Sequence, residues 1–195
     1  MTQISADRLS RAPRNRTLTL TEEERARYES RLLRLDRATL VNELLGRTVC
    51  QDIFDVLPLL PSASVDLLFA DPPYNLNKTF NQESFCNLSM AEYERWLDTW
   101  IGGVVRLLKP AASVYVCGDW RSSTAIQRVC DKYFTVRNRI TWEREKGRGA
   151  ENNWKNCSED IWFCTMGRKY TFNVDAVKLK RRIIAPYTKP DGQPK

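Results

Sequence analysis

Apolar and polar positions along the chain follow two patterns, one typical of short buried strands and one typical of amphipathic helices. Residues 48–52, 64–71 and 113–119 are short runs rich in β-branched and apolar residues, which predicts strands. Residues 90–108 and 121–133 instead carry apolar side chains at helical spacing. Strands that alternate with helices in this order predict an α/β fold, with a mostly parallel sheet covered by helices on both faces.

Local signals mark where several helices begin and end. Thr21 and Glu24 form a capping-box pattern, and the helix formers that follow predict a helix ending at Gly46, either continuous or broken in the middle. Residues 53–63 predict a helical turn closed by prolines. The long helix is expected to stop before Pro110. Its apolar face consists of Tyr93, Trp96, Leu97, Trp100, Ile101, Val104, Val105 and Leu108.

The second half of the chain ends in a pair of strands and a basic tail. Residues 136–144 and 159–165 predict a closing pair of strands joined by a polar loop. The last stretch, 178–195, is basic and interrupted by prolines, and it does not finish as a domain normally would. We therefore expect an N-terminal extension with its helix at 1–46, a sheet-forming segment at 47–177, and this basic C-terminal segment.

Composition limits the possibilities further. A chain of 195 residues with 42% apolar residues is long enough for one hydrophobic core and too short for two ordinary domains. The formal net charge of +7 and the isoelectric point near 9.2 favour a polyanionic partner such as nucleic acid, although many basic proteins bind none.

The cysteines and the apolar runs bear on metal and membrane binding. The six cysteines contain no C-x-x-C pair, and the chain has no histidine, so a zinc site would need four scattered thiols. We expect reduced, buried cysteines and no metal. No run of about 18 apolar residues occurs, which predicts a soluble, cytoplasmic protein without a membrane span.

One short motif carries candidate chemistry. In the stretch FADPPYNLN at 69–77, consecutive prolines follow an apolar run, and because proline cannot continue a central strand, the strand must end at Asp71. Ligands of open parallel sheets bind beyond the carboxyl ends of the strands, so Asp71 is placed at a candidate site. A rigid tight turn is the alternative. A D-P-P-aromatic stretch arises by chance about once in 10⁵ positions.

The DPPYNL motif after SVDLLFA resembles motif IV of the amino-methyltransferases that modify adenine N6 in DNA. TVCQD with the short helix after it looks like the opening of the permuted β group of these enzymes. ITWEREKGRG, NCSEDIWFCT and YTFN fall where that group has its later strands and loop. The resemblance covers roughly Arg47 to Pro186. Asp rather than Ser or Asn at position 71 favours adenine over cytosine N4 or a glutamine amide.

The resemblance implies a Rossmann-like class I methyltransferase sheet, with residues 47–177 as the catalytic subdomain, and S-adenosylmethionine-dependent methylation of adenine N6 in a specific sequence of double-stranded DNA. The catalytic residues would be Asp71, Pro72, Pro73 and Tyr74. The Asp71 carboxylate and the Pro72 carbonyl would each accept one N6–H, and the prolines would hold both acceptors in place. Tyr74 would stack on a base flipped out of the duplex.

Cofactor and DNA contacts are assigned by the same resemblance. Asp52 and Ile53, together with Asp71, would contact the cofactor, while a helix cap is the alternative for Asp52. A second set of residues would contact nucleic acid, combining amide, basic and aromatic side chains. For Lys78 and the loop residues the alternative is solvated surface, as it is for the basic run at 178–182. The nucleic-acid set is Asn75, Lys78, Lys146, Arg148, Trp154 and Lys155.

One departure from the family concerns glycine. Enzymes of this group need a glycine-rich turn, F-x-G-x-G-like, beside the methionine part of the cofactor, and none of the eight glycines here forms it. The family sheet order also places two strands, absent from this chain, between the strands at 48–52 and 64–71. The incomplete sheet would leave two strands with open apolar edges.

We therefore expect the catalytic, N-terminal half of a split restriction-modification methyltransferase. A second polypeptide would form a heterodimer with it and supply the glycine turn and most of the target recognition. A truncated chain or an inactive relative would have the same sequence features. A non-catalytic DNA-binding subunit, and a methyltransferase for RNA or a protein amide, remain open as alternatives.

Overall fold

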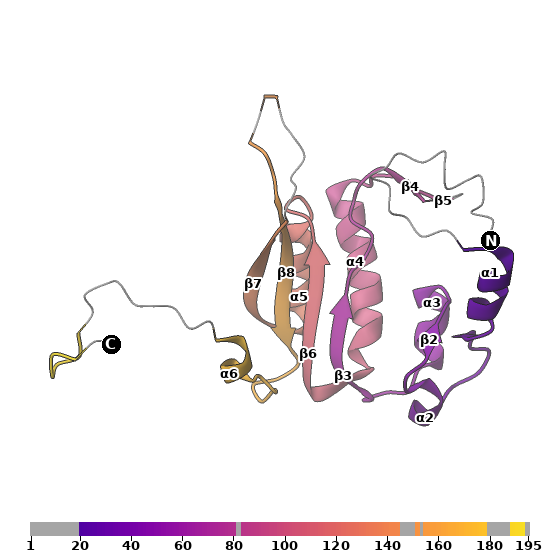
Figure 1. Cartoon of the computed structure of the whole chain (residues 1–195), viewed down its shortest axis with the longest axis horizontal. Coiled ribbons are helices and arrows are strands. Elements are labelled where there is room, and N and C mark those ends of the chain that lie inside the picture. Colours follow the sequence, from indigo (N-terminus) through magenta and orange to yellow (C-terminus); the bar gives the residue numbers. More distant parts are fainter. Residues whose placement is uncertain (1–19, 81–82, 145–150, 153, 179–187, 194–195) are drawn as a thin grey trace, which may run out of the picture. The chain divides into compact units, whose positions relative to one another are not determined.

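A computed structural model describes residues 20–80, 83–144, 151–152, 154–178 and 188–193, without the side chains of 78–85 (Figure 1). The chain divides into two compact units, Met1–Ser62 and Ala63–Lys195. Each unit is described by itself. Across the described residues, no helix is both long and apolar enough to cross a membrane.

The first unit begins with helix α1 (Glu22–Glu29). The Thr21 side chain accepts a hydrogen bond from the Glu24 backbone N–H, and the Glu24 carboxylate accepts one from the Thr21 backbone N–H, which confirms the capping box. The helix expected to reach Gly46 is broken. Strand β1 (Leu32–Leu33) lies in the gap and pairs in parallel with β2 (Thr48–Val49). The later elements of this unit are helix α2 (Val41–Leu44), helix α3 (Ile53–Val56) and the 3-10 helix η2 (Leu57–Leu59).

The second unit contains a four-stranded sheet in the order β3-β6-β8-β7. Its strands are β3 (Val65–Ala70), β6 (Leu108–Gly118), β7 (Thr135–Glu143) and β8 (Ser158–Thr165). Only β3 and β6 pair in parallel, because β8 lies between β6 and β7 and runs opposite to both. The expectation of a mostly parallel pairing was therefore wrong, whereas the closing pair of strands is confirmed. A separate hairpin joins β4 (Lys78–Phe80) to β5 (Glu83–Phe85).

Helices α4 (Met90–Val105) and α5 (Ser123–Tyr133) pack side by side on one face of this sheet (Figure 1). Trp162 of β8 points to this face, where its indole N–H donates to the Ser123 hydroxyl at 3.1 Å. Val114 and Val116 on the same face are 0% exposed. From α4, the side chains buried here are those at the expected helical spacing: Tyr93, Leu97, Trp100, Ile101 and Val104.

The boundary between α4 and β6 differs from the expectation. The helix ends at Val105, and β6 begins at Leu108 rather than at residue 113, so Pro110 lies inside a strand. The pairing register slips here, since Val65 pairs with Leu108 while Leu67 pairs with Ser113. Such an irregularity accommodates a residue that has no backbone N–H to donate.

The opposite face of the sheet carries a row of aromatic rings. Phe69 stacks on Tyr115 with ring centroids 6.0 Å apart, and Tyr115 stacks on Phe163 at 4.8 Å. At the β3 end of the row, Leu67 and Phe69 are 57% and 60% exposed. The expected cover of helices on both faces is therefore not present in the described part of the unit.

The outer edge of β3 is open within the described residues, because the sheet order ends at this strand. This agrees with the expectation that β3 would be an open edge. The strand expected at 48–52 lies instead with β1 in a separate two-stranded sheet.

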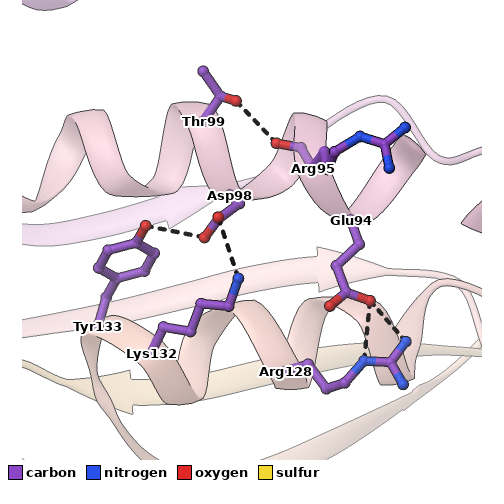
Figure 2. Close-up of polar contacts among 7 residues, drawn as sticks. All are labelled: Glu94, Arg95, Asp98, Thr99, Arg128, Lys132 and Tyr133. Atoms are coloured by element: carbon purple, nitrogen blue, oxygen red, sulfur yellow. Dashed lines mark hydrogen bonds and ion pairs between the residues drawn. The ribbon is translucent and has the colours of Figure 1, made fainter. Parts of the chain in front are cut away.

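Polar contacts join α4 to α5 on their outer surface (Figure 2). Arg128 donates to the Glu94 carboxylate at 2.7 and 3.0 Å, and Asp98 pairs with Lys132 at 3.2 Å. The Tyr133 hydroxyl donates to Asp98 at 2.9 Å. It also lies so close to Gly102 that a Cβ there would be only 2.9 Å from the hydroxyl oxygen. These contacts fix the two helices against each other.

The remaining elements and the thiols complete the description. Helix α6 (Val174–Val177) follows the sheet. All six cysteines are free thiols. The expectation that they are buried is wrong for Cys50 and Cys86, which are exposed, and Cys157 is only half-buried. The buried thiols are Cys117 of β6, Cys130 of α5 and Cys164 of β8.

Candidate active site

The motif at 71–74 lies where several strand ends converge. Strand β7 runs in the same direction as β3 and β6, because both β6 and β7 are antiparallel to β8. Asp71, Asp119 and Arg144 follow these three strands. They therefore lie together at the carboxyl end of the strands, where β8 begins. Glu159, the second residue of β8, lies at the same end of the sheet. This is the position where open α/β sheets bind their ligands.

The turn itself is anchored from two elements distant in sequence. The strand stops at Ala70, one residue before Asp71, where the prolines were expected to end it. The buried Tyr93 of α4 donates its hydroxyl hydrogen to the Pro73 carbonyl at 3.0 Å. Tyr74 donates its own hydroxyl hydrogen to Glu159 Oε2 at 3.2 Å. The turn is thus held both by proline rigidity and by two side-chain hydrogen bonds.

Two asparagines hold the segment that follows. The Asn75 amide donates to the Leu88 carbonyl at 2.8 Å and accepts from the Leu88 backbone N–H at 2.8 Å. Asn77 accepts from the Asn87 backbone N–H at 2.7 Å. The side chain of Asn75, expected near DNA, is therefore engaged with the backbone just before α4. A DNA contact by Asn75 stays a prediction.

Two acceptors of the turn are left without a donor. Asp71 is exposed, and neither its carboxylate nor the Pro72 carbonyl has a hydrogen-bond or ion-pair partner among the described residues. The neighbouring Glu159 carboxylate, by contrast, accepts from Arg144 at 2.5 Å. The site therefore offers a free carboxylate and a free carbonyl from adjacent residues, on a backbone locked by proline.

Burial and nearby carboxylates keep the Tyr74 hydroxyl and the Cys117 thiol in their neutral forms. Burial, and then the Asp71 and Glu159 carboxylates, raise the pKa of the Tyr74 hydroxyl well above its ordinary value. Burial and the same two carboxylates raise the pKa of the Cys117 thiol to about 11. At neutral pH, Tyr74 is an uncharged ring with a hydroxyl donor, and Cys117 is an unreactive thiol.

The hydroxyl of Tyr93, on α4, is also neutral at neutral pH. Burial, with the Asp119 carboxylate nearby, raises the pKa of Tyr93 to about 12. Asp119 accepts from the Ser122 backbone N–H at 2.9 Å, directly before α5. Asp119 is thus hydrogen-bonded at the start of α5. Asp71 is an unpaired carboxylate in the described part of this end of the sheet.

The expected cofactor residues of the first unit lie at the start of α3. Asp52 Oδ1 accepts from the Phe54 backbone N–H at 2.8 Å, so Asp52 caps this helix, as its alternative interpretation held. Ile53 is exposed. A cofactor contact by either residue stays a prediction.

Of the expected DNA contacts in the β7–β8 connection, only part is described. Trp154 is 97% exposed, and Lys155 is also exposed. Lys146, Arg148 and the side chain of Lys78 lie outside the described residues. Their expected roles remain predictions.

The structure also brings forward residues that the sequence did not single out. Trp120 and Trp142, at the ends of β6 and β7, are exposed, and the Arg121 guanidinium lies 5.3 Å from the Trp120 ring centroid. An aromatic residue close to a strand end was the available signal. Glu159 and Arg144 had no such signal, because the contact of Glu159 with Tyr74 spans 85 positions.

Comparisons with known proteins identify the family of this chain. A family model described as DNA methylase matches residues 65–184. The chain is 32% identical over 154 residues to DNA adenine methyltransferase YhdJ of Escherichia coli (strain K12), a match that covers 73% of this chain and 51% of YhdJ. It is 28% identical over 137 residues to Type II methyltransferase M.BamHI of Bacillus amyloliquefaciens, covering 70% of this chain and 32% of that protein.

A solved structure resembles the fold. The PvuII DNA methyltransferase (cytosine-N4-specific) matches with a TM-score of 0.56 at 17% identity, covering 67% of this chain and 52% of that one. This likeness concerns the fold alone, and it confirms the expected class I methyltransferase architecture with a partial sheet. The chain spans about half the length of YhdJ and of the PvuII enzyme.

Proposed function

This chain belongs to the DNA methylase family whose model matches residues 65–184, and we propose that it carries the catalytic residues for S-adenosylmethionine-dependent methylation of adenine N6 in a specific DNA sequence. The single observation that carries the proposal is a pair of acceptors at the carboxyl end of β3, the Asp71 carboxylate and the Pro72 carbonyl, which have no partner among the described residues. YhdJ, a relative named as a DNA adenine methyltransferase, supports the same substrate.

The chemistry requires two fixed acceptors. The N6 lone pair of adenine is delocalised into the ring, which makes the amine a poor nucleophile. Asp71 and Pro72 would each accept one N6–H and draw the nitrogen toward tetrahedral geometry. Because the prolines and the Tyr93 hydrogen bond hold the turn, this arrangement needs no reorganisation during the reaction. The Asp71 carboxylate can hold the proton that the alkylated nitrogen releases.

The base would reach these acceptors by leaving the duplex. The uncharged Tyr74 ring offers an aromatic face on which a flipped purine can stack. The exposed Trp154 and Lys155 supply an aromatic surface and a positive charge for the DNA around the base, and Asn75, Lys78, Lys146 and Arg148 are proposed to join them. The net charge of +7 favours the same polyanionic partner.

The methyl group would come from S-adenosylmethionine, and this chain would hold only part of that cofactor. Asp52, Ile53 and Asp71 are the residues proposed to contact it. Among the described glycines, the positive backbone φ angles occur at Gly46 and Gly192, and neither follows a strand of the four-stranded sheet. This supports the proposal that the chain forms only part of the cradle for the methionine moiety.

A second polypeptide would complete the enzyme. Three features support a partner that adds strands and cofactor contacts. The outer edge of β3 is open in the described residues, and Leu67 and Phe69 are exposed. The sequence also has no glycine-rich turn of the expected kind. We propose that this partner also carries most of the target recognition, forming a heterodimer of a restriction-modification system.

The experiment is to purify the chain alone and with co-expressed products of neighbouring genes. Calorimetry would measure S-adenosylmethionine binding, and transfer of a tritiated methyl group to unmethylated genomic DNA would measure activity. We expect binding and transfer only with the partner, and N6-methyladenine on nucleoside analysis. Appreciable cofactor binding by the isolated chain would refute the split site.

The alternatives predict different results. A non-catalytic DNA-binding subunit would leave activity unchanged after Asp71→Ala. An RNA methyltransferase would label RNA and leave duplex DNA unlabelled, and N4-methylcytosine in the product would overturn the choice of adenine.

A further inference from the structure

A carboxylate on β8 reaches the motif from far along the chain. Glu159 Oε2 accepts the Tyr74 hydroxyl hydrogen at 3.2 Å, while Glu159 Oε1 accepts from Arg144 at 2.5 Å. The Glu159 side chain is only 14% exposed, in contrast to the free and exposed Asp71. Both oxygens of this carboxylate are thus occupied.

The β7–β8 hairpin aims this carboxylate. Glu159 pairs with Trp142 in the strand register, and the Arg144 backbone N–H donates to the Cys157 carbonyl at 2.6 Å. Arg144 and Glu159 are therefore held together by the strands that carry them. A largely buried carboxylate is costly without a cation, and Arg144 supplies the compensating charge.

We propose that Glu159 is a positioning residue for the methyl transfer, which fixes the Tyr74 ring through its hydroxyl so that the ring lies ready beside Asp71 for the flipped purine. Arg144 neutralises Glu159, so that Asp71 is the carboxylate left to bind the amine. This inference rests on the proposed function.

The physical reason is that the turn fixes only one end of the tyrosine. The prolines hold the Tyr74 backbone, but the ring can still rotate about its side-chain torsions. A hydrogen bond at the far end of the ring removes that freedom, and a charged acceptor makes the bond stronger than a neutral one. Small misplacements of a positioning group can reduce a rate by up to about 10²-fold.

The test compares Tyr74→Phe, Glu159→Ala and the double variant in whichever preparation transfers methyl groups, the chain alone or its complex. The assay measures transfer of tritiated methyl to unmethylated genomic DNA. We expect each single variant to lower kcat by about 10-fold while the KM for DNA changes less than about 2-fold. The double variant should be no slower than the slower single variant, because both remove one interaction.

Two further variants separate positioning from folding. Glu159→Gln keeps a carbonyl acceptor and should recover part of the lost kcat. Glu143→Ala removes an exposed carboxylate at the end of β7 and should leave kcat unchanged. Should Glu159→Ala fail to fold, Tyr74→Phe and Glu159→Gln carry the same comparison.

The outcomes separate this inference from the proposed function. Unchanged kcat in the single variants, or fully multiplicative losses in the double variant, would overturn the positioning role while the unmodified protein still methylates DNA. Absence of methyl transfer by every preparation of the unmodified protein would instead overturn the proposed function, and this inference with it.

Discussion

The two faces of the four-stranded sheet are completed to different degrees. On one face, Val114 and Val116 are 0% exposed beneath α4 and α5, and the two helices are joined by ion pairs such as Glu94–Arg128. On the other face, Leu67 and Phe69 of β3 remain more than half exposed, next to a strand edge that is open in the described residues.

This difference suits two separate tasks of the proposed enzyme: binding of the target amine, and binding of the cofactor with recognition of the DNA sequence. The turn proposed to be catalytic depends on the covered side, since Tyr93 of α4 donates a hydrogen bond to the Pro73 carbonyl. The groups expected to bind the amine are therefore preformed in this chain. The open side is where cofactor binding and target recognition would be completed. The predictions below test this separation.

The largest effect should follow removal of the free carboxylate. Asp71→Ala should lower methyl transfer by about 10³-fold, because it removes an acceptor aimed at the reacting amine. Its melting temperature should stay unchanged, since Asp71 is exposed and has no partner among the described residues. Methylation kinetics measure the loss of transfer, and thermal unfolding measures the melting temperature. Asp66→Asn, on the strand β3 that leads to the turn, serves as the control, and a large loss of stability in Asp71→Ala would contradict the site.

The contrast between the faces should appear in stability. Val116→Ala, under the helices, should lower the free energy of unfolding by about 2 to 3 kcal/mol because it leaves a cavity in the core. Leu67→Ala on the open face should change it by less than about 0.5 kcal/mol. Urea denaturation of the isolated chain measures both. Equal losses would show that the open face is covered in the free chain.

The open face should matter for association. Leu67→Glu should weaken binding of the second polypeptide by at least about 10-fold, because a charge would be buried in an apolar interface. The isolated chain should retain its melting temperature. Sedimentation or surface plasmon resonance measures the affinity. An unchanged affinity would place the interface elsewhere.

The smallest effect should come from the link between the two regions. Tyr93→Phe removes the hydrogen bond to Pro73 and should lower stability by about 1 kcal/mol at neutral pH. The folded pKa of Tyr93 is about 12 against an ordinary value of 10.0, so the stability from its neutral form is complete below pH 10 and is lost as pH rises toward 12. Denaturation between pH 8 and 12 should show a smaller alkaline loss in Tyr93→Phe. An identical loss in both proteins would exclude this burial effect.

Local features of the fold were predictable from the sequence. The end of β3 before Asp71 follows from the missing N–H of Pro72, and the start of α1 follows from the Thr21 and Glu24 pattern. The buried face of α4 follows from helical spacing. Each depends on residues close together in the chain, so each can be worked out without knowing the sheet.

Other features depended on distant contacts. The insertion of β8 between β6 and β7 reversed the expected parallel pairing, and the register slip placed Pro110 in a strand. The exposure of Cys50 and Cys86 followed from where their segments lie, because a cysteine by itself does not determine its burial.

By itself, the amino-acid order determined the chemistry at the strand end: a carboxylate and a proline carbonyl presented side by side on a rigid backbone. Only the tertiary structure decided which groups surround them. It left Asp71 without a partner among the described residues, engaged Asn75 with Leu88, and brought Glu159 to Tyr74 across 85 positions. Backbone rigidity is a local property of proline, whereas the partners of a side chain are set by strand order and register.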